Sequence, residues 1–182
     1  MIYIIALIFV FLIILFMLNF EYYRHKLGVS TSHSSQAMRE EILKEIISVA
    51  HEKTALKIVD PGSGSGELVR MIARNMPHAT VIGMELSPIP FWQSKIKSML
   101  FGPKNALFKM DDFFKFDYSD VDIVVTFLPE PVLHKLADTI KDQLPTGSVV
   151  ISNAFELPQG WSEYKRSMVQ PVLKRYLFCY KK

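Results

Sequence analysis

The sequence contains a single cysteine, Cys179, among its 182 residues. An internal disulfide is therefore excluded, which agrees with a reducing compartment. The chain also lacks internal repeats and low-complexity tracts. Its 21 Lys and Arg against 18 Asp and Glu leave a net charge of only +3, and the lysines are scattered rather than striped. This pattern favours a solvated surface over a nucleic-acid footprint, so no nucleic-acid partner is expected.

Charge is absent from residues 1–20, which read MIYIIALIFVFLIILFMLNF. As a helix this run would be roughly 30 Å long, the thickness of a bilayer's hydrocarbon core. A cleaved signal peptide is the alternative, but a basic N-terminal region and a small-residue cleavage site are both missing. We therefore predict a transmembrane anchor at 1–20, a juxtamembrane linker at 21–35 and one domain at 36–182.

The predicted anchor has its basic residues on one side only. Arg24 and Lys26 follow it, and Tyr22 and Tyr23 stand where interfacial aromatics are common. The charge asymmetry predicts a single-pass membrane protein whose domain faces the cytoplasm.

Beyond the linker, apolar residues at helical spacing predict an amphipathic helix over 36–51, and then strands and helices alternate. This alternation, with mostly apolar strands, predicts an α/β fold with a doubly wound, mostly parallel sheet. Two later stretches without helical period, about 163–169 and 173–181, predict a closing antiparallel C-terminal pair. The other strands are expected at 56–60, 80–85, 106–110, 121–128 and 147–154, and the other helices at 67–76, 89–100 and 130–143.

The first strand runs into the glycine-rich stretch VDPGSGSGE, residues 59–67. Glycines on a strand-to-helix turn let a ligand approach the backbone closely. The Gly-Lys-Ser/Thr ending of a P-loop is missing, as is the third glycine of the dinucleotide fingerprint. Glu67 at the helix N-terminus would also repel a pyrophosphate, so a phosphate ligand is disfavoured. A glycine-rich turn in some other α/β protein remains the alternative.

The pattern Asp60-x-Gly62-x-Gly64-x-Gly66 resembles the first motif of class I S-adenosylmethionine-dependent methyltransferases. That cofactor carries a sulfonium and an ammonium, which acidic residues beside the loop would attract. In a doubly wound sheet the ligand lies at the carboxyl ends of the strands. Glu85, about twenty residues beyond the loop, ends the second strand and could accept both ribose hydroxyls.

The third and fourth strand ends continue this pattern. Asp112 could accept the adenine amino group while Phe113 covers the ring, and Thr126 to Pro129 form a rigid lip beside the transferred methyl. Each residue alone has another explanation: Asp60 could cap the next helix, and Glu85 and Asp112 could be solvated loop acids. Their order along consecutive strand ends favours the cofactor site.

The stretch from KMDDFF through TFLPEP to the residues Phe155, Pro158 and Trp161 looks like a small membrane-anchored family. Its mitochondrial members are protein-lysine methyltransferases of the ATP synthase c subunit and the adenine nucleotide carrier, and bacterial relatives exist. The resemblance implies a Rossmann-like methyltransferase fold, S-adenosyl-L-methionine as the cofactor and a lysine of a membrane-associated protein as the acceptor. Two departures stand out: residues 30–33 read STSH where the family has Pro-Thr-Pro, and Ser65 replaces an acidic residue or asparagine.

Methyl transfer from a sulfonium needs positioning more than a base, a nucleophile or a metal, and no metal site is expected. An acceptor lysine must arrive neutral, so an apolar channel would help and Glu130 is a more plausible orienting group than a base. Alternative functions are a methyltransferase for a small molecule or lipid, and a membrane-tethered cofactor-binding module without catalysis. The predicted catalytic residues are Phe127, Leu128, Pro129 and Glu130, and the predicted cofactor-binding residues are Asp60, Gly62, Ser63, Gly64, Gly66, Glu85, Leu86, Asp112, Phe113 and Thr126.

Overall fold

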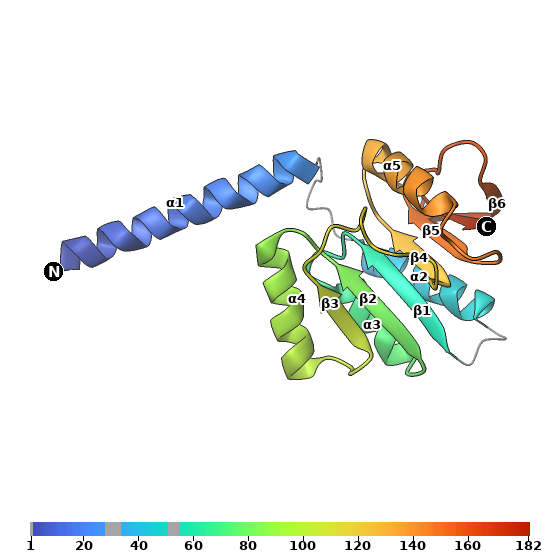
Figure 1. The fold of residues 1–182 in the computed structure, drawn as a ribbon, viewed down its shortest axis with the longest axis horizontal. Helices are drawn as coiled ribbons and strands as arrows, with labels where there is room; N and C mark the ends of the chain where they lie inside the picture. Colours follow the sequence, from blue (N-terminus) through green and yellow to red (C-terminus); the bar gives the residue numbers. More distant parts are fainter. Residues whose placement is uncertain (1, 28–33, 51–54) are drawn as a thin grey trace.

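The computed structural model describes residues 2–27, 34–50 and 55–182, with the backbone alone at 2, 17 and 19–27. The elements follow one another in the order drawn in Figure 1. The helices are α1 (Ile2–Leu27), α2 (Gln36–Val49), α3 (Glu67–Asn75), α4 (Pro88–Phe101) and α5 (Glu130–Lys141). The strands are β1 (Leu56–Pro61), β2 (Ala79–Met84), β3 (Ala106–Lys109), β4 (Ile123–Thr126), β5 (Val149–Asn153), β6 (Ser162–Gln170) and β7 (Arg175–Lys181).

The strands form one sheet in the order β3-β2-β1-β4-β5-β7-β6. The pairs from β3 to β5 are parallel, while β7 runs antiparallel to both β5 and β6. The predicted fold class is confirmed, including the antiparallel C-terminal pair. The chain order reverses between β1 and β4, so the carboxyl ends of these strands form the switch point where ligands bind in open α/β sheets.

Two apolar layers hold helices against the sheet. On one face α2, α3 and Phe91 of α4 pack against alternate residues of the strands, such as Ile58 and Val81. On the other face α5 packs beside two irregular segments that bring Phe113, Tyr118 and Leu157 into the core. This second face has helical cover only from α5 within the described domain, so the segment after β3 must bury its aromatics to close it. That requirement places the residues after β3 close to the switch point.

The N-terminal helix α1 extends away from the domain in Figure 1. Each of its described side chains from Tyr3 to Phe16 is exposed, although most are large and apolar. Of the helices within the described residues, none has both the length and the apolarity needed to cross a membrane. The predicted transmembrane span is therefore not confirmed. The predicted linker is helical up to Leu27, and residues 28–33, including the STSH departure, lie outside the described residues.

Candidate functional site

The glycine loop turns sharply between β1 and α3, and the backbone of β2 holds it in place. The N–H groups of Gly62 and Ser63 both donate to the carbonyl oxygen of Met84, at 2.8 and 2.9 Å. Gly62, Gly64 and Gly66 have φ angles of 76°, 54° and 72°, in the left-handed region that other residues rarely adopt. Glycine is thus required by the local backbone at each alternate position.

The three glycines differ in what surrounds them. A Cβ at Gly62 would lie 2.9 Å from a methyl carbon of Leu128, and one at Gly66 would lie 2.3 Å from the ring of Phe108. A Cβ at Gly64 would meet nothing within 4 Å. Gly62 and Gly66 therefore allow close packing within the fold, whereas the backbone of Gly64 borders open space that a ligand can enter.

Asp60 stands at the end of β1, beneath the loop, with 6% of its surface exposed. Burial, together with the neighbouring charge of Glu85, raises the pKa of its carboxyl group from 3.8 to about 8. A carboxyl group in this state is largely protonated at neutral pH, and a nearby cation would favour its ionised form. The position suits a ligand that carries positive charge.

Glu85, just after β2, is also buried, and both of its carboxylate oxygens accept backbone hydrogen bonds. Oε2 accepts from the N–H of Gly64 at 3.0 Å, and Oε1 accepts from the N–H of Ser87 at 2.7 Å. These bonds fix the carboxylate against the glycine loop. An ionised carboxylate has about four acceptor positions, so room remains for two further donors. Its predicted role with the ribose hydroxyls is compatible with this arrangement. Leu86, the next predicted contact, is half-buried beside it.

After β3 two neighbouring phenylalanines differ in burial, and Phe113, the ring predicted to cover the adenine, is the buried one. Phe113 lies in the core with 4% exposure, whereas Phe114 is half-buried and has the ammonium group of Lys135 over its ring, 4.5 Å from the centroid. The rings contact each other at 4.6 Å between centroids. Oδ1 of Asp112 accepts from the N–H of Phe114 at 3.0 Å, which orders this turn. Phe114 is thus the more accessible of the two rings.

Three buried oxygen atoms at the carboxyl ends of the parallel strands β1, β4 and β5 have no hydrogen-bond partner among the described residues. They are Oγ of Ser63, Oγ1 of Thr126 and Oδ1 of Asn153. A buried polar atom left without a partner costs about 1–3 kcal/mol. These three atoms come from the glycine loop, the end of β4 and the end of β5. Oγ of Ser63 packs against Gly83 of β2, whereas the atoms of Thr126 and Asn153 stand at the ends of neighbouring strands, where a polar ligand would satisfy them.

The segment after β4 divides between the core and the surface. Leu128 has 1% exposure and packs beneath the glycine loop, so its side chain supports the loop rather than facing an acceptor. Phe127 stacks on Phe155, with 6.5 Å between ring centroids, and the guanidinium group of Arg175 lies 5.9 Å from the Phe127 ring. These three side chains form one side of the edge next to Thr126.

Two further residues of this segment were predicted to take part in catalysis. Pro129 is half-buried and directly precedes α5. Glu130 is exposed in the first turn of α5, with one carboxylate oxygen 3.9 Å from Nε2 of His134. The location of Glu130 is that of a solvated surface acid, and the catalytic assignments of both residues stay predictions.

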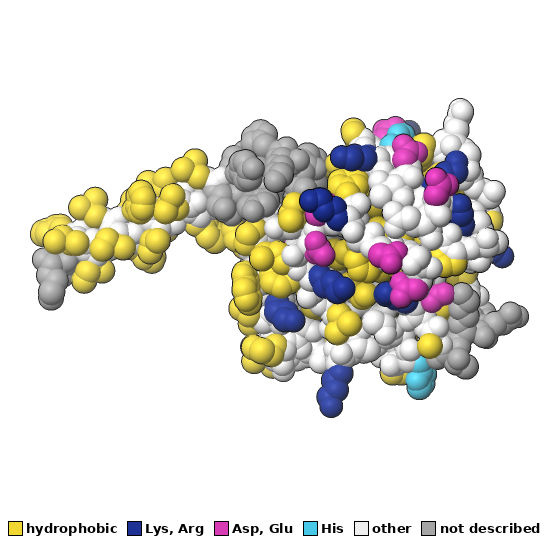
Figure 2. Space-filling view, in the orientation of Figure 1, with side chains coloured by type: hydrophobic (Ala, Val, Ile, Leu, Met, Phe, Trp, Pro, Cys, Tyr) yellow, Lys and Arg dark blue, Asp and Glu magenta, His cyan; other side chains and the backbone are white. Residues whose placement is uncertain are grey.

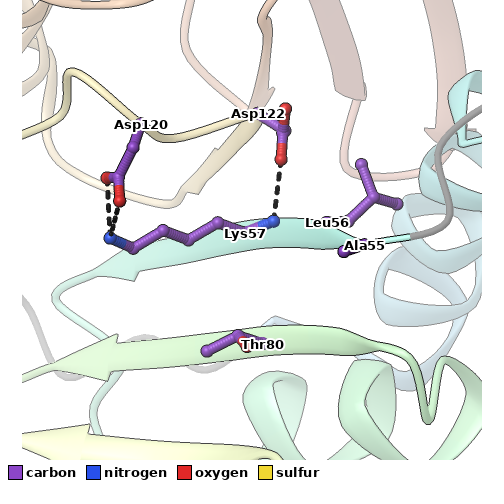
Figure 3. A pocket seen from close by; sticks show the side chains of 6 residues that line it. All are labelled: Ala55, Leu56, Lys57, Thr80, Asp120 and Asp122. Carbon is purple, nitrogen blue, oxygen red and sulfur yellow. Dashed lines mark hydrogen bonds and ion pairs between the residues drawn. The ribbon is translucent and has the colours of Figure 1, made fainter.

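A hollow at the opposite edge of the sheet is drawn in Figure 3. It lies at the amino ends of β1 and β2, where Lys57 forms an ion pair with Asp120 at 2.6 Å and donates its backbone N–H to Asp122 at 2.8 Å. The ammonium group of Lys57 is thus paired with Asp120, and its backbone N–H is paired with Asp122. The glycine loop and Glu85 belong to the other edge, so we assign no role in the chemistry to this hollow. Among the described residues, no group of three His, Cys, Asp or Glu side chains could hold a metal ion.

Comparison with known proteins identifies the family to which this chain belongs. Residues 60–165, more than half of the chain, match the model of the ANTKMT methyltransferase domain. The chain belongs to that family. It is 31% identical over 103 residues to the adenine nucleotide translocase lysine N-methyltransferase of Mus musculus, a match that spans 56% of this chain and 44% of the relative. The predicted family resemblance is confirmed, and the chain matches less than half the length of that relative.

Solved structures share the fold at low sequence identity. An RNA methyltransferase from Salinibacter ruber, in complex with S-adenosyl-L-homocysteine, superposes with a TM-score of 0.69 at 20% identity, over 82% of this chain and 93% of that one. Magnesium protoporphyrin IX methyltransferase from Synechocystis, with bound S-adenosylmethionine, gives 0.62 at 13% identity, over 90% and 91%. These likenesses establish the methyltransferase fold and say nothing of the acceptor.

The predicted cofactor, S-adenosylmethionine, is confirmed by this family membership, and the residues present fit it. Gly64 borders open space, Glu85 retains acceptor positions, and Asp60 is poised to ionise beside a cation. The unpartnered hydroxyl of Thr126 lies at the end of β4, the neighbour of β1 at the same edge. The individual contacts remain predictions.

Sequence reasoning overlooked two residues at this edge. Asn153 ends β5 with its amide nitrogen donating to Oγ of Ser34 at 2.8 Å, and Arg175 begins β7. Asn153 could have been found by extending the inspection of strand ends from the fourth strand to the fifth. Arg175 lies at the amino end of an antiparallel strand, and only the pairing of β7 with β5 brings it to this edge.

Proposed function

We propose that this chain transfers a methyl group from S-adenosylmethionine to a lysine side chain of a membrane-associated protein. The observation that carries the proposal is the family match over residues 60–165, which includes every predicted cofactor contact. A relative in the same family is named as a lysine N-methyltransferase of the adenine nucleotide translocase, which supports lysine as the acceptor class.

When bound, the cofactor supplies a methyl group already activated by its sulfonium. Within this chain the task is to hold the cofactor and to orient the acceptor in line with it. Glu85 and the glycine loop, joined by the Gly64 hydrogen bond, form the rigid part of the cofactor site. The acceptor would approach over the end of β4, beside Thr126 and Phe127, where the described edge offers an aromatic surface.

A lysine acceptor must lose its proton before it can attack. Deprotonation at pH 7 costs about 4–5 kcal/mol because the free side chain titrates near 10.4. The stacked rings of Phe127 and Phe155 would desolvate the ammonium form, and the positive charge of Arg175 would repel it. Both effects lower the pKa of the acceptor. Glu130 would act in the opposite sense, but its exposure weakens that effect.

The proposed location is a membrane, with attachment through α1 and the domain on the cytoplasmic side. Residues 1–20 carry no charge, and the described side chains of α1 make an exposed, mainly apolar surface. Arg24 and Lys26 follow this surface, which supports the cytoplasmic placement. Attachment would raise the local concentration of a membrane-bound acceptor without any new contact to it.

The test uses the purified full chain, methyl-labelled S-adenosylmethionine and membranes from cells that lack this chain. We expect label in the protein fraction, recovered as methyl-lysine after hydrolysis. The matched control is Glu85→Ala, which removes the carboxylate from the cofactor site. Label in the organic extract would replace the proposal with a lipid methyltransferase. Cofactor binding with no transfer to either fraction would indicate a binding module without catalysis.

A further inference from the structure

Helix α4 has two apolar faces, and the fold uses only one of them. Phe91 and Ser94 are its buried residues and face the sheet beside β3. On the far side of the helix a second apolar stripe points to solvent. It consists of Trp92, Ile96, Met99 and Leu100, with exposures of 55%, 48%, 76% and 60%. We call these four residues the outer face of α4.

The spacing of the outer face shows that it is one continuous stripe. Its members stand at positions i, i+4, i+7 and i+8, which share one side of an α-helix. At about 100° per residue, this stripe lies opposite Phe91 and Ser94. Figure 2 shows hydrophobic side chains gathered over α4 along the left edge of the domain. A soluble surface rarely exposes such a group of large apolar side chains without a partner for them.

The charged residues of α4 itself are of one sign. Lys95 and Lys97 project on either side of the stripe, and α4 contains no Asp or Glu. The wider stretch 86–110 has four lysines and no acidic residue or arginine. Basic side chains also lie close to the hydrophobic patch in Figure 2. An apolar stripe flanked by lysines, with a tryptophan in it, is typical of helices that lie in the interface of an anionic bilayer.

We propose that the outer face of α4 docks on an anionic lipid surface. The apolar stripe enters the boundary between headgroups and acyl chains, while Lys95 and Lys97 bind the lipid phosphates. This contact is separate from α1 and from the cofactor site, and it does not depend on methyl transfer. A second copy of the chain is a poorer occupant, because a symmetric pair would bring the lysines of both copies together.

The docked orientation has a consequence for the site. α4 begins at Pro88, three residues after Glu85, so its N-terminal end lies at the carboxyl edge of the sheet. Trp92 is in the second turn from that end. A domain resting on α4 would therefore hold the opening of the cofactor site level with the bilayer surface. Loops of membrane proteins lie at that height, whereas a domain held by α1 alone could rotate away from them.

The test follows the fluorescence of Trp92 in the full chain. The sequence has two tryptophans, so Trp161→Phe leaves Trp92 as the only reporter. The protein is reconstituted with phosphatidylcholine vesicles, with or without phosphatidylglycerol, and with bromine on the acyl chains for quenching. We expect a shift of Trp92 emission to shorter wavelength, quenching by the bromolipid and protection from aqueous acrylamide, all stronger in the anionic vesicles. Co-flotation is not the readout, because α1 would contribute to it in every sample.

Two charge-reversed variants, each made in the Trp161→Phe protein, are compared. Lys95→Glu with Lys97→Glu should lower the ratio of docked to undocked protein by at least about 25-fold, about fivefold for each lysine lost. Lys174→Glu with Lys181→Glu makes the same change in net charge on the exposed C-terminal hairpin and should leave Trp92 fluorescence unchanged. Circular dichroism and thermal unfolding check that each variant is folded.

Three results would overturn the proposal. The first is Trp92 emission that neither vesicle changes. The second is a response that is equal in neutral and anionic vesicles and survives the Lys95 and Lys97 reversals. The third is a blue shift that depends on protein concentration in detergent without vesicles, with a dimer in sedimentation, which would assign the face to a second copy.

Discussion

We predict that Asp60 makes cofactor binding depend on pH, and the raised pKa of its carboxyl group sets the direction of that dependence. Its pKa of about 8 in the free protein means that the carboxyl group is mostly neutral at pH 7. The positive charges of S-adenosylmethionine favour the carboxylate, so binding should lower this pKa and release the proton. At pH 7 the expected release is about 0.9 proton, provided that the pKa in the complex falls to about 5 or below.

The same linkage fixes how affinity and stability change with pH. Below pH 8 each unit of rising pH should strengthen cofactor binding by up to about tenfold, and the gain should level off above pH 8. The free protein should respond in the opposite direction. Because the folded pKa is raised above the unfolded value of 3.8, stability falls as pH rises from about 4 to about 8. Asp60→Asn should therefore stabilise the free protein at pH 8, by about 5 kcal/mol at most.

The assay is calorimetric titration with S-adenosylmethionine in buffers of different ionisation enthalpy, which gives the number of protons released. Asp60→Asn is measured in parallel, because proton changes on the amino group of the cofactor are common to both proteins. We expect the wild type to release close to one proton more than Asp60→Asn at pH 7, and equal numbers above pH 9. Equal proton release by the two proteins at pH 7 would refute the reasoning.

Three other predictions follow from the site and the core. Gly64→Ala should cost about 1–2 kcal/mol of stability, because its backbone is left-handed. Gly66→Ala should cost about 2–5 kcal/mol, because its Cβ also meets the Phe108 ring. Equal unfolding temperatures for the two variants would contradict this difference. Glu85→Ala should weaken cofactor binding by at least about a hundredfold in calorimetry, since the two predicted hydrogen bonds from the ribose hydroxyls to a charged group would be lost. It also removes the two backbone hydrogen bonds that hold the glycine loop and Ser87. Near-normal affinity would remove Glu85 from the site. Burial raises the pKa of Cys179 to about 12, so iodoacetamide at pH 8 should modify it only as fast as the protein unfolds; rapid labelling of the folded protein would show that the thiol is accessible.

Much of the fold could be predicted because the local patterns agree with the tertiary structure. The apolar strands and the helical periods lie within three residues of the observed bounds, as for the strand expected at 121–128 and found at Ile123–Thr126. The glycine loop was also predictable, because left-handed backbone and close packing restrict the residue types that fit. The positions of the strands and helices and the glycines of the loop are each determined by short, local segments of sequence.

Other features depend on contacts that the sequence does not display. Phe113 and Phe114 are identical in type, and only the need to cover the second face of the sheet decides that Phe113 is the buried one. Leu128 was predicted among the catalytic residues, yet its side chain is buried and packs beneath Gly62. The second apolar stripe of α4 was hidden because a helix with apolar residues on two sides shows no clear helical period.

The most direct test of the proposed site is a crystal structure of this chain with S-adenosyl-L-homocysteine. The account predicts that the ligand lies over Gly64 at the carboxyl edge of the sheet. Its ribose hydroxyls should donate to Glu85, and its adenine should lie beside Asp112. A ligand bound at another edge of the sheet, or a folded protein that binds no ligand at saturating concentration, would contradict the account.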